Sequence, residues 1–353
     1  MSQMIHGGDI YNNRIELDFS VNLNPLGTPE PVKNALVEAM ANIGEYPDIE
    51  YSEVRRIIGE NNGLSAECVL PGNGASECFM AIAKTVNPGK ALINEPAFYG
   101  YRYALESIPG CEIGETIPEN ITEEMLAEVN LIFLNDPVNP TGKNLGDDYI
   151  RNVLEKARGV GAYVVLDESF YYLSDKAASG DDIGNNISNE IGNDFHAARL
   201  LSEFDNLIIV RSYTKLFAIP GVRIGYMLSS RENIAKISKH LPEWNLSCFA
   251  SKAAVVCERM MNVDFCTRTY EYIRSEREFL EAGLSALGMK VYPGDTSYLM
   301  IKAEPEFKEK LLERGILIRD CSNFKTLEKG HFRIAVKDHE SNVRLLETIG
   351  EII

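Results

Sequence analysis

The stretch 211-RSYTKLFAIPGVRIG-225 decides the fold, because it places a lysine, Lys215, directly after an apolar segment. That segment, Leu207–Arg211, is rich in β-formers and predicts a buried strand. A lysine is almost never fully buried without a purpose, and one whose pKa is lowered by burial and nearby cations can attack a carbonyl carbon. Two hydroxyl residues and an arginine beyond a Pro-Gly turn can hold a phosphate beside it. Taken alone, the stretch is better explained by a surface lysine at a helix N-terminus.

Outward from this stretch, short apolar runs alternate with amphipathic segments such as Asp147–Arg158. Strands that alternate with helices predict an α/β fold, with a mostly parallel central sheet and helices on both faces. The runs that predict buried strands are Lys90–Glu95, Leu131–Asn135, Tyr163–Asp167, Leu207–Arg211 and Arg223–Leu228.

The two ends of the chain have a different pattern. Residues 28–42 predict a helix with Thr28 as N-cap and Pro29 as first residue, residues 248–285 are helical in character throughout, and the last fifty alternate again. We therefore predict a large domain over residues 45–235 and a smaller α+β domain built from residues 1–44 and 236–353. The polar segment 174–193 predicts a surface loop, either an insertion or a lid.

Charge and composition limit the partners of this 353-residue chain. Its net charge of -17 has the wrong sign for nucleic acid, so an anionic substrate needs a local basic pocket. We see no signal peptide and no apolar run of the ~20 residues that a membrane helix needs, so we expect a cytoplasmic protein. The seven scattered cysteines form no CxxC pair and predict buried thiols in a reducing compartment, with no metal site.

Three more motifs precede the lysine, and each has an ordinary alternative. Asp167 ends a predicted strand, where open α/β sheets place ligands, but it could be a helix cap. The motif 139-NPTG-142 follows another strand and could be a plain turn. The motif 72-GNGASE-77 opens an apolar helix and can form an anion cradle of backbone amides, although one Gly-rich turn is a weak signal.

The order and spacing of the four motifs resemble those of the fold type I pyridoxal-phosphate (PLP) enzymes, the aminotransferase class I/II family, over essentially the whole chain. The resemblance implies that Lys215 holds PLP covalently and that Asp167 keeps the pyridine nitrogen protonated, so that the ring acts as an electron sink. It also implies further cofactor contacts: Asn139 to the ring hydroxyl, Phe98 stacked on the ring, and Gly74, Ala75, Ser76, Ser212, Thr214 and Arg223 around the phosphate.

Two further positions follow from the resemblance. Tyr46 matches a tyrosine that reaches the cofactor phosphate of a neighbouring subunit, which implies a homodimer; the alternative is a plain turn tyrosine. Arg333 matches the arginine that forks onto the substrate carboxylate, the alternative being a surface ion pair at a strand edge. Phe98 could likewise be a core aromatic.

The branch of the family depends on weaker signals. Many relatives carry a tyrosine three residues after the strand-end aspartate, where this chain has Phe170. The start 6-HGG-8, the segment with Asn22 and the segment with Arg319 resemble L-threonine-O-3-phosphate decarboxylases. Histidinol-phosphate aminotransferases share the core motifs and remain the alternative. Either branch implies a small phosphorylated substrate, an amino acid in the decarboxylase branch, held by His6, Asn22, Arg319 and Arg333.

Overall fold

The computed structural model describes residues 7–12, 14–117, 121–179, 197–261 and 263–353. Its centre is a seven-stranded sheet with the strand order β2-β8-β7-β6-β5-β3-β4. Four pairings in this sheet are parallel and only β8 runs against its neighbours, which confirms the predicted mostly parallel sheet. The strands are β2 (Val69–Gly72), β3 (Lys90–Asn94), β4 (Glu112–Thr116), β5 (Leu131–Asn135), β6 (Tyr163–Asp167), β7 (Leu207–Ser212) and β8 (Gly225–Leu228).

Both faces of this sheet are buried, because alternate side chains of each central strand enter different cores. In β6, Val164 and Leu166 belong to one apolar cluster, while Val165 between them belongs to the other. A period of two with apolar residues on both faces requires helices on both sides. The helices of this part are α2 (Ser52–Asn61), α3 (Ala75–Val86), α4 (Tyr99–Glu106), α5 (Glu123–Leu126), α6 (Asp147–Gly159), α7 (Asp175–Ser179), α9 (Tyr213–Leu216) and α10 (Arg231–Ile237).

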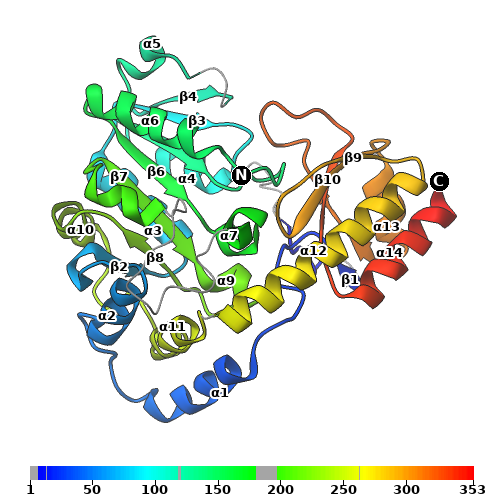
Figure 1. The fold of residues 1–353 in the computed structure, drawn as a ribbon, viewed down its shortest axis with the longest axis horizontal. Helices are drawn as coiled ribbons and strands as arrows, with labels where there is room; N and C mark the ends of the chain where they lie inside the picture. Colours follow the sequence, from blue (N-terminus) through cyan, green and yellow to red (C-terminus); the bar gives the residue numbers. More distant parts are fainter. Residues whose placement is uncertain (1–6, 13, 118–120, 180–196, 262) are drawn as a thin grey trace.

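A second sheet and a third apolar cluster lie at the opposite end of the molecule (Figure 1). The strands β12 (Arg319–Asp320), β13 (His331–Ala335), β10 (Tyr298–Lys302) and β9 (Lys290–Tyr292) form an antiparallel sheet in that order. Helices α13 (Phe307–Glu313) and α14 (His339–Ile352) accompany it. The amino-terminal strand β1 (Leu17–Asp18) pairs with β11 (Ile316–Leu317), which ties the two ends of the chain together. The predicted domain limits stay a prediction.

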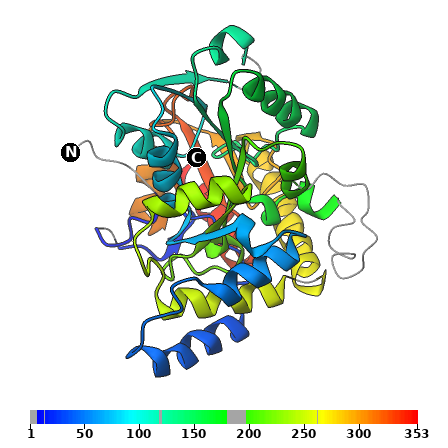
Figure 2. The same ribbon diagram turned by 90° about the vertical axis from the view of Figure 1, so that its left-hand side faces the viewer.

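Two long helices connect these parts. The helix α12 (Val263–Ala286) runs diagonally from the large sheet to the small one, and α11 (Cys248–Met260) packs on α1 (Glu30–Ala39). Both views show α1 at the lower edge of the molecule (Figures 1 and 2). The predicted helix 248–285 is therefore two helices, because the first ends at Met260 with Met261 as its cap.

Two other expectations differ from the structure. The N-cap position of helix α1 is Pro29, which makes no side-chain cap, and the Thr28 hydroxyl donates to the Ala218 carbonyl oxygen instead of capping the helix. The predicted loop 174–193 begins with the short helix α7, and its remainder lies outside the described residues. Ion pairs hold α7: Asp175 binds Arg277 of α12, and Lys176 binds Asp136. These tertiary contacts outweigh the polar composition that indicated a loop.

Candidate active site

The carboxyl ends of the parallel strands meet at one edge of the large sheet, as parallel pairing requires. Asp167 is the last residue of β6, Ser212 the last of β7, and Glu95 follows β3. A pocket of about 300 Å³ opens there, in the size range of small-molecule sites. Its lining includes twelve of the residues expected from the sequence: Asn22, Ala75, Ser76, Phe98, Asn139, Asp167, Ser212, Thr214, Lys215, Arg223, Arg319 and Arg333.

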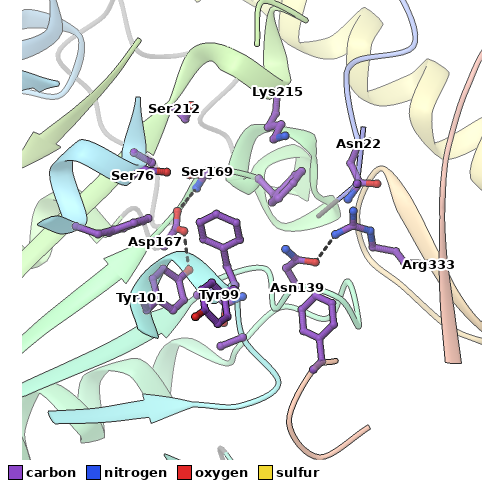
Figure 3. Close-up of a pocket in the computed structure, with 18 of the residues that line it drawn as sticks. Asn22, Ser76, Tyr99, Tyr101, Asn139, Asp167, Ser169, Ser212, Lys215 and Arg333 are labelled. Atoms are coloured by element: carbon purple, nitrogen blue, oxygen red, sulfur yellow. Dashed lines mark hydrogen bonds between the residues drawn. The ribbon is translucent and has the colours of Figure 1, made fainter. Parts of the chain in front are cut away.

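Lys215 lies on the one-turn helix α9 and faces this pocket (Figure 3). Burial, followed by the positive charges of Arg333 and Arg223, lowers the pKa of its amine to about 8. Desolvation and like charges both disfavour the ammonium form. A substantial fraction of the amine is therefore neutral near pH 8, as covalent capture of a carbonyl requires.

Asp167 is held by two hydrogen bonds on the wall of the pocket. The Tyr101 hydroxyl donates to its Oδ2 at 2.6 Å, and the Ser169 backbone N–H donates to its Oδ1 at 2.9 Å (Figure 3). Burial raises the pKa of the Asp167 carboxyl, and the two donors act in the opposite direction. A desolvated carboxylate favours a cationic partner, and a protonated pyridine nitrogen is one.

A cluster of phosphate-binding groups surrounds the start of α3. Gly74 precedes this helix with φ +77°, and a Cβ there would lie 2.5 Å from Nη2 of Arg223. Only glycine therefore allows the guanidinium to approach the helix N-terminus. The hydroxyls of Ser212 and Thr214 lie 2.7 Å apart in the same lining. A helix N-terminus, two hydroxyls and an arginine together suit a phosphate dianion.

Arg333 lies buried on β13 at the other side of the pocket. Its Nη1 donates to Asn139 Oδ1 at 2.5 Å and its Nη2 to the Ser20 carbonyl oxygen at 2.9 Å (Figure 3). The Asn22 amide, oriented with its oxygen toward Arg333, accepts from Nε at 3.1 Å. Burial lowers the pKa of the Arg333 guanidinium. A buried arginine whose neighbours are neutral amides and a carbonyl is suited to bind a carboxylate.

Arg319 stands directly opposite Arg333 in the antiparallel pair of β12 and β13. Its guanidinium donates to two neutral acceptors, Asn323 Oδ1 at 2.8 Å and the Asp320 carbonyl oxygen. Burial and the charge of Arg333 lower its pKa to about 10. Two like charges opposite each other across a strand pair are unfavourable, so the pair indicates a site for anions.

Phe170 occupies the position where many relatives have a tyrosine. It packs edge-on against Tyr298, with ring centroids 5.2 Å apart, and Lys215 Nζ lies 5.8 Å from its centroid. The Tyr298 hydroxyl donates to the Val138 carbonyl oxygen, and the Tyr172 hydroxyl accepts from Arg211. These two hydroxyls are therefore engaged elsewhere and do not replace the one that Phe170 lacks.

Three expected residues are not in the lining of this pocket. Gly74 stands one residue before Ala75, at the phosphate cradle. His6 lies outside the described residues, although the neighbouring Gly7 lines the pocket. Tyr46 is 81% exposed and packs against Trp244 in a tilted arrangement with ring centroids 4.8 Å apart. Its role in a neighbouring subunit stays a prediction.

Sequence reasoning missed several residues of the pocket. Tyr101, which binds Asp167, follows Phe98 by three residues. In a helix this spacing places the two side chains on one face, and it was the only signal in the sequence that Tyr101 also reaches the pocket. Glu95 is the last residue of the predicted strand Lys90–Glu95, and Lys325 follows the segment that contains Arg319. The missed charged or polar lining residues are Ser20, Glu95, Tyr99, Tyr101, Arg102, Asn135, Ser169, Asn323 and Lys325.

The residues present fit PLP. Lys215 offers an amine of lowered pKa, Asp167 a buried carboxylate, and the start of α3 a phosphate cradle. Asn135 also lines the pocket, and its buried Oδ1 has no hydrogen-bond partner among the described residues. The fold and this constellation define a fold type I PLP-dependent enzyme.

The chain belongs to the aminotransferase class I and II family, which it matches over residues 14–349. It is 29% identical over 351 residues to the threonine-phosphate decarboxylase of Salmonella typhimurium, covering 96% of this chain and 91% of that protein. It is 31% identical over 346 residues to histidinol-phosphate aminotransferase 2 of Archaeoglobus fulgidus, covering 95% and 93%. A solved histidinol-phosphate aminotransferase from Clostridium acetobutylicum superposes with a TM-score of 0.83 at 26% identity, covering 95% of this chain and 98% of that one.

Proposed function

We propose that this enzyme acts at the alpha carbon of a phosphorylated amino acid, in the manner of a threonine-phosphate decarboxylase. The observation that carries the proposal is the pair of buried arginines opposite each other on β12 and β13. Arg333 suits the substrate carboxylate, and Arg319 then remains for a second anionic group. The relatives that bear the names threonine-phosphate decarboxylase and histidinol-phosphate aminotransferase support a phosphate as that group.

The charge of the pocket supports two anions besides the cofactor phosphate. Six basic and two acidic side chains line it, in a chain whose net charge is -17. Arg223 lies at the cofactor phosphate cradle, Lys215 holds the cofactor, and Arg333 suits the carboxylate. The basic residues that remain are Arg102, Arg319 and Lys325. A local positive field of this kind is needed to attract a phosphate dianion against the global charge.

Some side chains of the pocket orient the substrate, and Lys215 transfers a proton. PLP, when bound, supplies an electron sink for the bond that breaks at the alpha carbon. Arg333, with Asn22 and Asn139 beside it, fixes the plane of the substrate carboxylate and thereby selects the bond perpendicular to the ring. Lys215 Nζ, whose pKa is about 8, can take or return a proton at the alpha carbon.

The alternative is a histidinol-phosphate-type aminotransferase. It would use the same residues and move the alpha proton, and pass the amino group to 2-oxoglutarate. Phe170 and the 6-HGG-8 start favour the decarboxylase. The decisive experiment supplies O-phospho-L-threonine alone and, separately, histidinol phosphate with 2-oxoglutarate. We expect carbon dioxide from the first and no glutamate from the second; the reverse result would establish the aminotransferase.

The phosphate assignment predicts the behaviour of Arg319→Ala. A charge-assisted hydrogen bond to phosphate contributes about 1.5–3 kcal/mol, so the variant should bind O-phospho-L-threonine roughly ten- to a hundredfold more weakly. Binding of L-threonine should hardly change, because threonine never makes that contact. Titrations of both ligands, followed by the cofactor absorbance, measure the difference. Equal losses for the two ligands would show that Arg319 does not anchor the phosphate.

We further propose that the active unit is a homodimer with Tyr46 at the partner's cofactor phosphate. An apolar surface supports this, formed by residues of α1, the segment after it and Trp244. Its exposed members are Val37, Met40, Ile43, Tyr46, Ile49 and Trp244, each at least 40% exposed. Exposed apolar patches of this kind mark interaction surfaces.

A further inference from the structure

A buried carboxyl lies among the cations of the pocket, where the proposed function gives it no role. Glu95 directly follows β3, is 4% exposed and lines the pocket. A carboxylate there opposes the binding of a phosphate dianion. We call the group formed by Glu95, Arg102, Arg319, Asn323 and Lys325 the distal pocket.

Contacts between charged side chains connect Glu95 to these cations. Arg102 of α4 forms its close ion pair with Glu115 of β4, while its Nη2 lies 3.8 Å from Glu95 Oε1. Lys325 Nζ lies 3.7 Å from Glu115 Oε1. Arg102 is thus committed mainly to Glu115, and Glu95 is not neutralised by a close ion pair of its own.

Burial is the largest influence on the protonation of Glu95, ahead of the charges around it. Burial raises the pKa of the Glu95 carboxyl to about 7. The Ala97 backbone N–H, Arg102 and Lys325 oppose the shift, and Glu115 adds to it. A phosphate dianion placed among these groups adds a further negative charge, and a nearby negative charge favours the neutral form of a carboxyl group.

We propose that Glu95 is a specificity-determining residue of the distal pocket, which takes up a proton when a phosphorylated amino acid binds and then donates a hydrogen bond to the phosphate. The inference rests on the proposed phosphorylated substrate. The proton comes from the buffer and remains on the Glu95 carboxyl while the ligand is bound, so no bond to carbon is involved. A substrate without the phosphate does not drive this uptake, because it adds no negative charge at the distal pocket.

The test is calorimetric titration of the holoenzyme in buffers of different ionisation enthalpy. The ligand is 1-aminopropan-2-yl phosphate, which O-phospho-L-threonine becomes when it loses carbon dioxide, because it carries the same phosphate and cannot be decarboxylated during the titration. At pH 7.5 a carboxyl with a pKa of about 7 is about one quarter protonated, so binding should take up roughly half to three quarters of a proton at Glu95. Glu95→Gln keeps a neutral hydrogen-bond donor of the same shape, and its binding of the ligand should lack this proton uptake. Its affinity should also change less from pH 6.5 to 8.5 than that of the wild type, whose affinity should weaken by a further factor of roughly ten.

Two controls separate the possible failures. Glu112→Gln removes an exposed carboxylate at the start of β4 and should keep the wild-type proton uptake. 1-Aminopropan-2-ol, the same ligand without its phosphate, should show no difference between wild type and Glu95→Gln. If the phosphate ester binds better than the alcohol but the two proteins take up equal numbers of protons, the Glu95 inference is overturned and the proposed function stands. If the phosphate ester binds no better than the alcohol, both are overturned.

Discussion

At the scale of single residues, the site depends on charged groups that the fold has removed from water. Lys215 has a lowered amine pKa because it is desolvated beside Arg333 and Arg223. The Asp167 carboxylate accepts hydrogen bonds from the Tyr101 hydroxyl and the Ser169 backbone N–H, and both lower its pKa against the effect of burial. Each of these groups would be ordinary in solution, and the burial gives it the chemistry that the family needs.

Lys215→Ala should remove covalent cofactor binding and leave the fold intact. The amine serves to bind the cofactor, and it makes no structural ion pair in the described part of the chain. The variant with added PLP should lack the visible band of the lysine-bound cofactor, while its circular dichroism stays that of the wild type. Borohydride reduction of the wild type followed by peptide mass analysis should place the cofactor on Lys215. A normal band in the variant would refute the assignment.

Tyr101→Phe should shift the acidic limb of the pH–activity profile to higher pH. The Tyr101 hydroxyl lowers the pKa of Asp167, so its loss raises that pKa, and the carboxylate form is then lost at a higher pH. We expect kcat to fall roughly tenfold while the cofactor stays bound. Tyr99→Phe is the matched control, because the Tyr99 hydroxyl donates to Glu106 and should leave the acidic limb in place. An unchanged limb in Tyr101→Phe would contradict the coupling to Asp167.

At the scale of elements, the short helix α9 needs anchors, because one turn of helix is not stable alone. The Tyr213 hydroxyl of α9 donates to Glu258 of α11 at 2.5 Å, and Glu258 also accepts from Asn61 of α2 at 2.6 Å. Behind it, Arg211 of β7 forms a buried ion pair with Glu168 at 2.7 Å. Lys215 is thus positioned by a buried polar network that reaches three helices and a strand.

Glu258→Ala should therefore lower the free energy of unfolding by about 1–3 kcal/mol, because it leaves the buried Tyr213 hydroxyl without its acceptor. Glu258→Gln keeps an acceptor and should lose less than half of that. Glu53→Ala removes an exposed partner of Arg259 on the same helix and should cost under about 1 kcal/mol. Urea unfolding measures all three; equal effects for the Glu258 and Glu53 variants would show that the anchor is unimportant.

At the scale of the whole molecule, strand pairing brings the two ends of the chain together beside the large sheet. The parallel pair of β1 and β11 joins residues 17–18 to residues 316–317. This pairing places Asn22 near Arg333, so the pocket draws on both ends of the chain and on its middle. No described helix is long and apolar enough to cross a membrane.

The dimer proposal predicts a mass of twice the 39.4 kDa chain by light scattering at micromolar concentration. Ile43→Asp places a charge in the exposed apolar surface and should shift the protein toward the monomer and reduce its activity. Val160→Asp, which alters an exposed apolar residue outside this surface, should stay dimeric. A fully active monomeric wild type would rule the dimer out.

The sequence alone determined the parallel sheet and most of the residues around the pocket. Four strands, β3, β5, β6 and β7, were predicted to within one residue, because continuous apolar runs leave a buried strand little freedom. Lys215, Asp167 and Arg223 could be identified because local motifs in a fixed order carry them.

Only the tertiary structure decided how distant residues act on these groups. Tyr101 meets Asp167 across 66 positions of sequence, and Arg333 meets Asn139 across 194. The register of β12 against β13 places Arg319 opposite Arg333, and a shift of one residue would turn the side chain away. Helix α7 also escaped prediction, because ion pairs to α12 and to Asp136 hold it. Local propensity and periodicity report burial and secondary structure, whereas the partner of a buried charge is decided by packing between elements far apart in the chain.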